Sequence, residues 1–260
     1  SAVLDPQAQI HPTAEIGPFC VVGPNVKIGA RCILHSHVVI QGTTEIGADT
    51  EVHPFCYLGM PPQELTRPTS GRLIIGQQNV IRQHVSIAVS TSQTHPTRVG
   101  DQVMIMGHAH IAHDCTIEDQ VVITHGVGLS GHVSVARGAV LGGQVGAHQF
   151  TRVGCYAMVG GQTGIITDIP PFTKVVGLPP RYIGCNVVGM ERAGFAPEVI
   201  TALEEALSIL FAQGHSLQEG LTHLAQMPLI PEVQHLIDFI HTSKRGVCLP
   251  LHFSVTSSHS

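Results

Sequence analysis

The chain has 260 residues, of which only 12% are charged and 4% are aromatic, and it contains no tryptophan. This composition is unusual for a layered α/β enzyme, but it suits a coil that buries small aliphatic side chains and turns on Gly, Pro, Asn and Asp. A net charge of −5 argues against a general nucleic-acid-binding protein, and no apolar run reaches the roughly 18 residues of a membrane-spanning helix.

An aliphatic residue returns every six positions over most of the first 165 residues, starting with the series Leu4, Ile10, Ile16, Val22, Ile28 and Leu34. This period fits neither an α-helix nor an ordinary strand. It indicates a solenoid in which each short strand buries one aliphatic side chain before a corner. Three hexads would form one triangular coil of about 18 residues, with neighbouring coils roughly 4.8 Å apart. Glycine often follows the aliphatic residue, and we expect it to relieve strain at the corner.

Two segments interrupt the period, at residues 59–74 and 88–98. The first contains the sequence PQEL and is too long for a corner, and the second has Gln93 where an aliphatic residue is due. We expect both segments to protrude as loops. Loops of this kind on a rigid scaffold commonly carry function, although a harmless insertion would look the same.

Beyond about residue 185 the six-residue period gives way to a helical one. We therefore divide the chain into a solenoid at residues 1–190 and a C-terminal helical domain at residues 191–260. Three helices are expected in the second part: one from Pro197 to Gly214, one that starts at an N-cap Ser216 with Glu219 completing a capping box, and one within residues 230–246.

A solenoid leaves strand edges unpaired at its two ends, and these edges need cover. Helices could cover one end, and self-association could cover a side face. We therefore expect a homo-oligomer, and a three-sided prism favours a threefold axis, that is, a homotrimer. The polar tail after Cys248 is expected to fray.

The seven cysteines form no C-x-x-C pair. Several lie within the coil repeats, where a small thiol packs well in the interior. This usage is typical of a protein in a reducing compartment, and we expect a cytoplasmic location.

The stretch GHAHIAHDC at residues 107–115 is the richest in chemically active side chains. Because residues one coil apart should stack, it can be placed against the sequence that follows. The expected neighbours are Asp114 with His132, His110 with Gly128 and Gly146, and His113 with Gly131 and Gln149, the last of these next to His148. Histidines beside a column of glycines describe a polar cleft with room for a ligand.

Two kinds of chemistry fit this cluster, although any single histidine in so histidine-rich a chain is more often structural. His113 could be a general base, because imidazole titrates near pH 6.5 and a neighbouring carboxylate would orient it. A zinc site would instead need His110, His113, His132 and His148 to converge. We favour acid–base chemistry, because His110 and His113 should point to opposite faces of an extended segment.

The motifs HAHIAHDC, LSGHVSV and GAHQF, together with PQEL and DIPPF, make the chain resemble the UDP-N-acetylglucosamine 3-O-acyltransferases that open lipid A biosynthesis. The resemblance covers nearly the whole chain. It implies a left-handed parallel β-helix, an exception to the usual right-handed crossover. It also implies a homotrimer with active sites between neighbouring subunits, and no metal or cofactor.

The resemblance implies that His113 removes the proton from the sugar 3-hydroxyl, which then attacks the thioester of a 3-hydroxyacyl acyl carrier protein. Asp114 would support the base. The N–H of Gly143, in the Gly142–Gly143 pair, would face the developing oxyanion. The positions that the resemblance implies for substrate contact are Glu64, His110, His132, His148 and Gln149, with Gly161 at the end of the acyl chain and Asn186 and Arg192 at the nucleotide.

The chain departs from the family pattern at Thr66, Val188 and Ala193, where the family commonly has charged residues. These departures leave open a different acceptor, namely the 3-amino analogue of the same sugar nucleotide. Two further alternatives stand beside the acyltransferase: a zinc-dependent γ-type carbonic anhydrase on a similar solenoid, and a scaffold that binds a sugar nucleotide without turnover.

Overall fold

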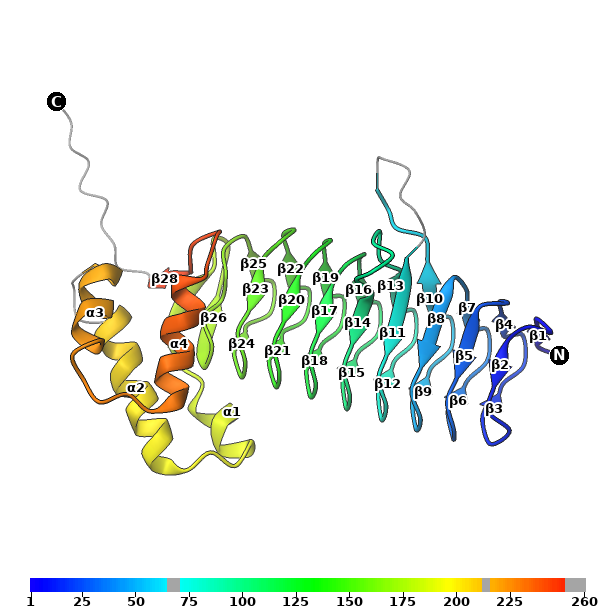
Figure 1. The fold of residues 1–260 in the computed structure, drawn as a ribbon, viewed down its shortest axis with the longest axis horizontal. Helices are drawn as coiled ribbons and strands as arrows, with labels where there is room; N and C mark the ends of the chain where they lie inside the picture. Colours follow the sequence, from blue (N-terminus) through cyan, green and yellow to red (C-terminus); the bar gives the residue numbers. More distant parts are fainter. Residues whose placement is uncertain (65–70, 212–215, 251–260) are drawn as a thin grey trace.

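The computed structural model describes residues 1–64, 71–211 and 216–250 of the chain. Short strands stack into a three-sided prism, and the four helices gather at the end opposite the N-terminus (Figure 1). Three sheets form the sides of the prism, and we call them sheets A, B and C in the order in which the chain visits them. Apart from one antiparallel pair near the helical end of sheet C, the strands of each prism side are parallel, as a solenoid requires.

Sheet A has nine strands: β1 (Val3–Leu4), β4 (Val21–Val22), β7 (Val39–Ile40), β10 (Tyr57–Met60), β13 (Ser86–Ala88), β16 (His110–Ile111), β19 (Gly128–Leu129), β22 (Gly146–Ala147) and β25 (Gly164–Ile165). Sheet B has eight: β2 (Gln9–Ile10), β5 (Val26–Ile28), β8 (Thr43–Ile46), β11 (Arg72–Ile75), β14 (Thr97–Val99), β17 (Thr116–Ile117), β20 (Ser134–Val135) and β23 (Arg152–Val153).

Sheet C has eleven strands: β3 (Glu15–Ile16), β6 (Ile33–Leu34), β9 (Glu51–Val52), β12 (Val80–Ile81), β15 (Met104–Ile105), β18 (Val122–Ile123), β21 (Val140–Leu141), β24 (Met158–Val159), β26 (Thr173–Val176), β27 (Arg181–Cys185) and β28 (Leu249–Pro250). Only β26 and β27 pair antiparallel among the described strands. The chain turns at an edge of the prism each time it passes from one sheet to the next. The AB edge, where the chain passes from sheet A to sheet B, holds the corners 112–115, 130–133 and 148–151. The CA edge, where it passes from sheet C to sheet A, holds corners such as 35–38, 53–56, 124–127, 142–145 and 160–163.

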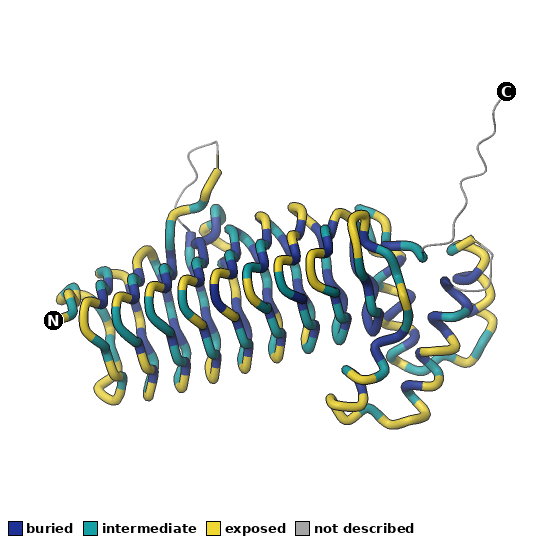
Figure 2. The backbone as a smooth tube through the Cα atoms, turned by 180° about the vertical axis from the view of Figure 1, so that it is seen from behind, coloured by how far each residue is buried: buried dark blue, intermediate teal, exposed yellow. Residues whose placement is uncertain are grey.

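The predicted hexad residues form the core. From Val22 to Ile165 each is at most 4% exposed, whereas Leu4, at the open N-terminal end, is 43% exposed. Most hexads also bury a second residue, two positions before the aliphatic one, such as Cys115 before Ile117. Buried stretches of the backbone recur from coil to coil along the prism (Figure 2). Four of the seven cysteines occupy this second position, and all seven are free thiols.

The expected role of the glycines at the corners is wrong. The left-handed conformation falls three residues after the aliphatic residue, and non-glycine residues such as His37, Asp114 and His132 adopt it there, with φ near 60°. Most glycines directly after the aliphatic residue instead allow two coils to approach. A Cβ at Gly47, for example, would lie 2.6 Å from the carbonyl carbon of Gly76.

The helices are α1 (Val187–Arg192), α2 (Pro197–Phe211), α3 (Leu217–Leu224) and α4 (Pro231–His241). The capping box at Ser216 and Glu219 is confirmed. Helix α1 was not expected, and it lies across residue 190, where the sequence suggests a boundary. The predicted helix end at Gly214 and the last ten residues of the tail lie outside the described residues. The first tail residues, Leu249–Pro250, pair with β27 instead of fraying.

An ion pair with a buried carboxylate joins the last coil to the helices. Asp168 is 1% exposed, and it accepts a hydrogen bond of 2.8 Å from Nε of Arg152. The same guanidinium donates to the carbonyl of Phe239 at 2.9 Å and lies 4.3 Å from the Phe239 ring centroid. Each charge is thus paired and hydrogen-bonded, as burial demands. None of the helices in the described part of the chain combines the length and apolarity needed to cross a bilayer.

Replacing Gly47 by Ala should destabilise the protein by about 1–3 kcal/mol, because the added methyl group must push two coils apart. The matched control is Gly128→Ala, where the added Cβ meets nothing within 4 Å. Urea unfolding of both variants measures the difference. If Gly47→Ala and Gly128→Ala unfold at the same urea concentration, close approach between coils is not the reason for glycine at these corners.

Candidate active site

Three polar side chains meet on the AB edge of the prism. Nδ1 of His113 lies 2.7 Å from Oδ2 of Asp114, and Nε2 of His132 lies 3.6 Å from the same oxygen. The His113 and His132 rings meet edge to face, with centroids 5.4 Å apart. The His113 and Asp114 side chains are buried, whereas that of His132 is 37% exposed. The stacking of Asp114 and His132 that the repeat predicts is therefore confirmed.

The loop that interrupts the repeat after Ile87 holds the carboxylate in place. Thr91 donates to Asp114 from its hydroxyl at 2.8 Å and from its N–H at 3.2 Å. Burial raises the pKa of the Asp114 carboxyl, but the hydrogen bonds from His113 and Thr91 outweigh burial, so the pKa lies below its usual value. Asp114 is therefore ionised at neutral pH and fixes the orientation of His113.

Gly131 packs directly against the imidazole of His113. A Cβ at this position would lie 2.5 Å from Cε1 and 2.8 Å from Nε2 of that ring. Only glycine fits here, because any side chain would collide with the imidazole. Gly131 lies beside Nε2, the ring nitrogen of His113 that does not contact Asp114. Sequence reasoning placed Gly131 above His113 but gave it no role.

A column of open space runs along sheet A next to this cluster. His110 pairs in register with Gly128, and Gly128 pairs with Gly146. A Cβ at either glycine would meet nothing within 4 Å, whereas one at Gly164 would strike the side chain of Leu178. The Nδ1 of His110 lies 2.8 Å from the Ser86 hydroxyl, and burial lowers the pKa of His110. A neutral imidazole therefore lies at one end of the column.

The end of the AB edge nearer the helices is partly apolar. Phe150 stacks on His132 with centroids 4.5 Å apart, and it is 55% exposed. His148 and Gln149 lie beside it, both exposed. Nδ1 of His148 lies 3.3 Å from the guanidinium of Arg245, which comes from the chain after α4. Sequence analysis missed Arg245, because nothing in the repeat indicates which C-terminal residue reaches this edge.

No thiol in this cluster is a nucleophile. Cys115 follows Asp114 directly, but burial raises the pKa of its thiol to about 12. It donates a hydrogen bond to the carbonyl of Ser130 and faces the interior of the coil. The groups available for chemistry on this edge are therefore the imidazoles, the carboxylate and the backbone.

Comparison with known proteins identifies the relatives of this chain. Two family models match it: the bacterial transferase hexapeptide repeat at residues 7–42 and 96–131, and domain 2 of the UDP-N-acetylglucosamine O-acyltransferases at residues 168–248. The acyl-(acyl carrier protein)–UDP-N-acetylglucosamine O-acyltransferase of Syntrophobacter fumaroxidans is 41% identical over 81% of this chain and 83% of that protein. This chain belongs to the UDP-N-acetylglucosamine O-acyltransferase family. The family member from Thermodesulfovibrio yellowstonii is 42% identical over 83% of this chain and 84% of its own.

Solved structures of the family share the fold. The crystal structure of the enzyme from Moraxella catarrhalis matches with a TM-score of 0.89 and 39% identity, over 94% of this chain and 96% of that one. The enzyme from Francisella novicida matches with a TM-score of 0.91 and 33% identity, over 96% and 93% of the two chains. The expected left-handed parallel β-helix with C-terminal helices is thereby confirmed. These relatives do not favour a carbonic anhydrase.

The structure separates two residues that the family resemblance implied for the site. Gly143 and Gly161 lie on the CA edge, whereas His113 lies on the AB edge, and the whole width of sheet A separates the two edges. A Cβ at Gly143 would approach Thr124 and His125, not His113. Within one subunit the N–H of Gly143 therefore cannot face a carbonyl bound at His113.

The remaining implied residues lie apart from the cluster. Asn186 is the N-cap of α1: it accepts from the N–H of Gly189 and donates to the carbonyl of Tyr156 at 2.8 Å. Arg192 ends α1 and is exposed, and Glu64 is exposed beside the undescribed residues 65–70. Thr66, one of the departures from the family pattern, falls outside the described residues.

The four histidines considered for zinc do not form one group. The three side chains whose ligand atoms approach within 4.8 Å of one another here are His113, Asp114 and His132. His110 bonds to Ser86 and His148 contacts Arg245, so each has a different neighbour. The geometry joins an imidazole to a carboxylate, which is the arrangement of an oriented general base.

Replacing Thr91 by Val should raise the pKa of Asp114, because the carboxylate loses one of the hydrogen bonds that stabilise it. In the native protein the folded-state pKa lies below the unfolded value. Asp114 therefore stabilises the fold above about pH 4, and this contribution is lost as the pH falls through the folded-state value. The free energy of unfolding of Thr91→Val should therefore fall less than that of the native protein as the pH is lowered through this range. Carboxyl-carbon NMR titration measures the pKa, and Thr94→Val, which touches Ser92 and His95 instead, is the control. An unchanged Asp114 pKa in Thr91→Val would contradict the role of the loop.

Proposed function

We propose that this protein is an acyl-(acyl carrier protein)–UDP-N-acetylglucosamine O-acyltransferase of lipid A biosynthesis. It moves a 3-hydroxyacyl chain from acyl carrier protein to the 3-hydroxyl of the sugar nucleotide. The observation that carries the proposal is the buried His113–Asp114 pair beside an open glycine column, in a chain of this family. Acyl carrier protein and UDP-N-acetylglucosamine are the partners, the location is cytoplasmic, and no step uses a metal or a cofactor.

His113 acts as the general base. Its Nδ1 carries the proton that it donates to Asp114, so Nε2 is free to accept one. The sugar hydroxyl loses its proton to Nε2 as its oxygen attacks the thioester carbonyl carbon, and a tetrahedral oxyanion forms. The carbon–sulfur bond then breaks, and the imidazolium returns the proton to the leaving thiolate. Asp114 stabilises the imidazolium during both steps.

The Gly131 peptide is the backbone group that we assign to the oxyanion within one subunit. Its Cα packs against the His113 ring, and we assign its N–H as the donor to the oxyanion because the attacked carbonyl binds beside that ring. Gly143 serves this site only if it comes from a neighbouring subunit. His110, His132, His148 and Gln149 border the same column and edge, and we assign them to binding the sugar and the acyl group.

The trimer is the arrangement that brings both edges into one site. If the CA edge of one subunit faces the AB edge of the next, Gly143 and Gly161 approach the His113 of the neighbour. The CA edge offers a surface for such packing, because stacked rings run along it from coil to coil. They are Phe19, His37, Phe55, His84 and His108, with centroids 4.6–5.1 Å apart.

Apolar side chains near the helical end suit the acyl chain. Phe150, Ile166 and Leu178 are 55%, 41% and 70% exposed, and each belongs to the AB edge or covers the glycine column. Gly161 limits acyl length in this proposal. A Cβ there would lie 3.2 Å from the carbonyl oxygen of Gly143, so a larger residue would fill space beside that peptide. Asn186 and Arg192 are assigned to the nucleotide.

Replacing His113 by Ala should lower acyl transfer by roughly 10²- to 10⁴-fold, because the sugar hydroxyl loses its base. The assay offers 3-hydroxyacyl carrier proteins of several lengths against UDP-N-acetylglucosamine and its 3-amino analogue. The control is His223→Ala, an exposed histidine of α3. Near-native turnover by His113→Ala would overturn the mechanism. If the native protein acylates only the 3-amino analogue, that analogue is the acceptor. If it binds both sugar nucleotides but acylates neither, the protein is a sugar-nucleotide-binding scaffold and not an acyltransferase.

Replacing Phe55 by Lys should break the trimer, because a charge would enter the middle of the ring column at a position that is 53% exposed in one subunit. Light scattering coupled to size exclusion gives the mass in solution. The matched control is Val188→Lys, an equally exposed apolar residue of α1, which belongs to neither edge. A native protein that runs as a monomer, or a Phe55→Lys variant that remains trimeric, would contradict this packing.

A further inference from the structure

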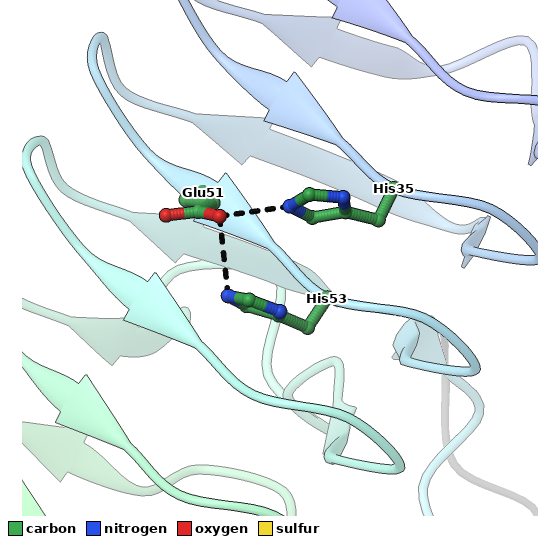
Figure 3. A group of neighbouring side chains, drawn as sticks. All are labelled: His35, Glu51 and His53. Carbon is green, nitrogen blue, oxygen red and sulfur yellow. Dashed lines mark hydrogen bonds and ion pairs between the residues drawn. The ribbon is translucent and has the colours of Figure 1, made fainter.

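Three polar side chains converge on sheet C, far from the cluster described above. Glu51 belongs to β9, His35 follows β6 and His53 follows β9. Nε2 of His35 lies 2.8 Å from Oε1 of Glu51, and Nε2 of His53 lies 3.2 Å from the same oxygen. Figure 3 shows both imidazoles directed at this carboxylate. Ligand atoms of the three residues all lie within 4.8 Å of one another.

The repeat itself builds this cluster. Glu51 and His53 flank the buried Val52, so both project outward from the same strand end. His35 occupies the equivalent position of His53 one coil earlier, and the two rings stack with centroids 4.7 Å apart and an interplanar angle of 26°. At other corners this position holds glycine, as at Gly17 and Gly47, or a variety of other residues. Because the position accepts many residue types, the coil does not require two successive histidines beside one carboxylate for folding.

We propose that His35, Glu51 and His53 bind a divalent transition-metal ion, with zinc as the reference ion. Two imidazole nitrogens and one carboxylate oxygen are a ligand set that zinc accepts, with water completing the tetrahedron. Both Nε2 atoms already face the Glu51 carboxylate, so small rotations of the three side chains would admit an ion between them. The ion would link the coil of β6 to the coil of β9.

The surroundings set two conditions on binding. In one subunit the three side chains are between 16% and 39% exposed, and none of them belongs to the ring column assigned to subunit packing, so an ion can reach them from solvent. Nη1 of Arg82 lies 3.5 Å from Nε2 of His53, and this guanidinium repels a cation at the same place. Arg82 is exposed and can turn away. Removing its charge should therefore tighten metal binding.

The site is separate from the catalytic cluster. His35 and His53 begin corners of the CA edge, whereas His113, Asp114 and His132 lie on the AB edge, several coils further along. Because the catalytic cluster also holds two histidines and a carboxylate in close approach, the experiment must assign each bound ion to one of the two places. The inference does not depend on the acyl transfer proposed above.

Calorimetric titration of the untagged, metal-free protein with zinc chloride tests the site. We expect His53→Ala and Glu51→Gln each to weaken binding of one zinc equivalent per chain by at least about tenfold, since each removes a ligand. His37→Ala is the matched control: it removes an exposed histidine of the same edge that has no carboxylate beside it, and binding should be unchanged. Arg82→Gln should bind zinc more tightly than the native protein.

Cobalt substitution gives a second readout, because a tetrahedral site of nitrogen and oxygen ligands has visible absorption bands that His53→Ala should abolish. Zinc should also raise the melting temperature of the native protein and not that of Glu51→Gln. Native-like binding by both ligand variants would overturn the proposal, as would equal loss in His37→Ala. Loss in His132→Ala alone would assign the ion to the catalytic cluster and equally refute the site on sheet C.

Discussion

Burial of one aliphatic side chain per hexad is the constraint on which the rest of the structure depends. A slip of one residue would turn a hexad aliphatic out of the prism, so the register between coils is fixed wherever the interior is packed. The register also determines which outward-facing side chains are adjacent, because each stacks on its counterpart in the next coil. His110 above Gly128 and Gly146, and Asp114 beside His132, follow from this packing and not from any attraction between polar groups.

The corners convert that register into chemistry. The third corner residue takes the left-handed conformation, which places Asp114 at φ 60° and His132 at φ 62°. Aspartate tolerates this conformation because its short polar side chain can bond locally. Here its carboxylate turns back to the ring of His113 and receives two hydrogen bonds from Thr91. Backbone geometry that recurs at most corners thus brings a carboxylate against an imidazole at the Asp114 corner.

Residue spacing alone predicted the prism, its core and the stacking of the site residues, because one short-range rule generates all three. The same rule could not indicate why glycines follow the aliphatic residues, since the close approach of Gly47 to Gly76 involves backbone atoms of different coils. Nor could it place Thr91, which reaches Asp114 from an interruption of the repeat. Helix α1 was missed because six residues are too few to show a helical period. Its N-cap, Asn186, was expected to contact the nucleotide and was not considered as a helix cap.

Gly143 and His113 lie on different edges of one subunit, so the geometry of a single chain cannot bring them into one site. Twelve residues separate Gly143 from Gly131, which is two corners of a three-cornered coil, so the two peptides belong to different edges. A role for both in one reaction then requires two subunits, because sheet A cannot fold its own edges together. If Gly143 takes part in the reaction as proposed, one subunit alone is incomplete. Packing of the CA edge against a neighbour would couple the exposed rings of Phe19 and Phe55 directly to the assembly of the site.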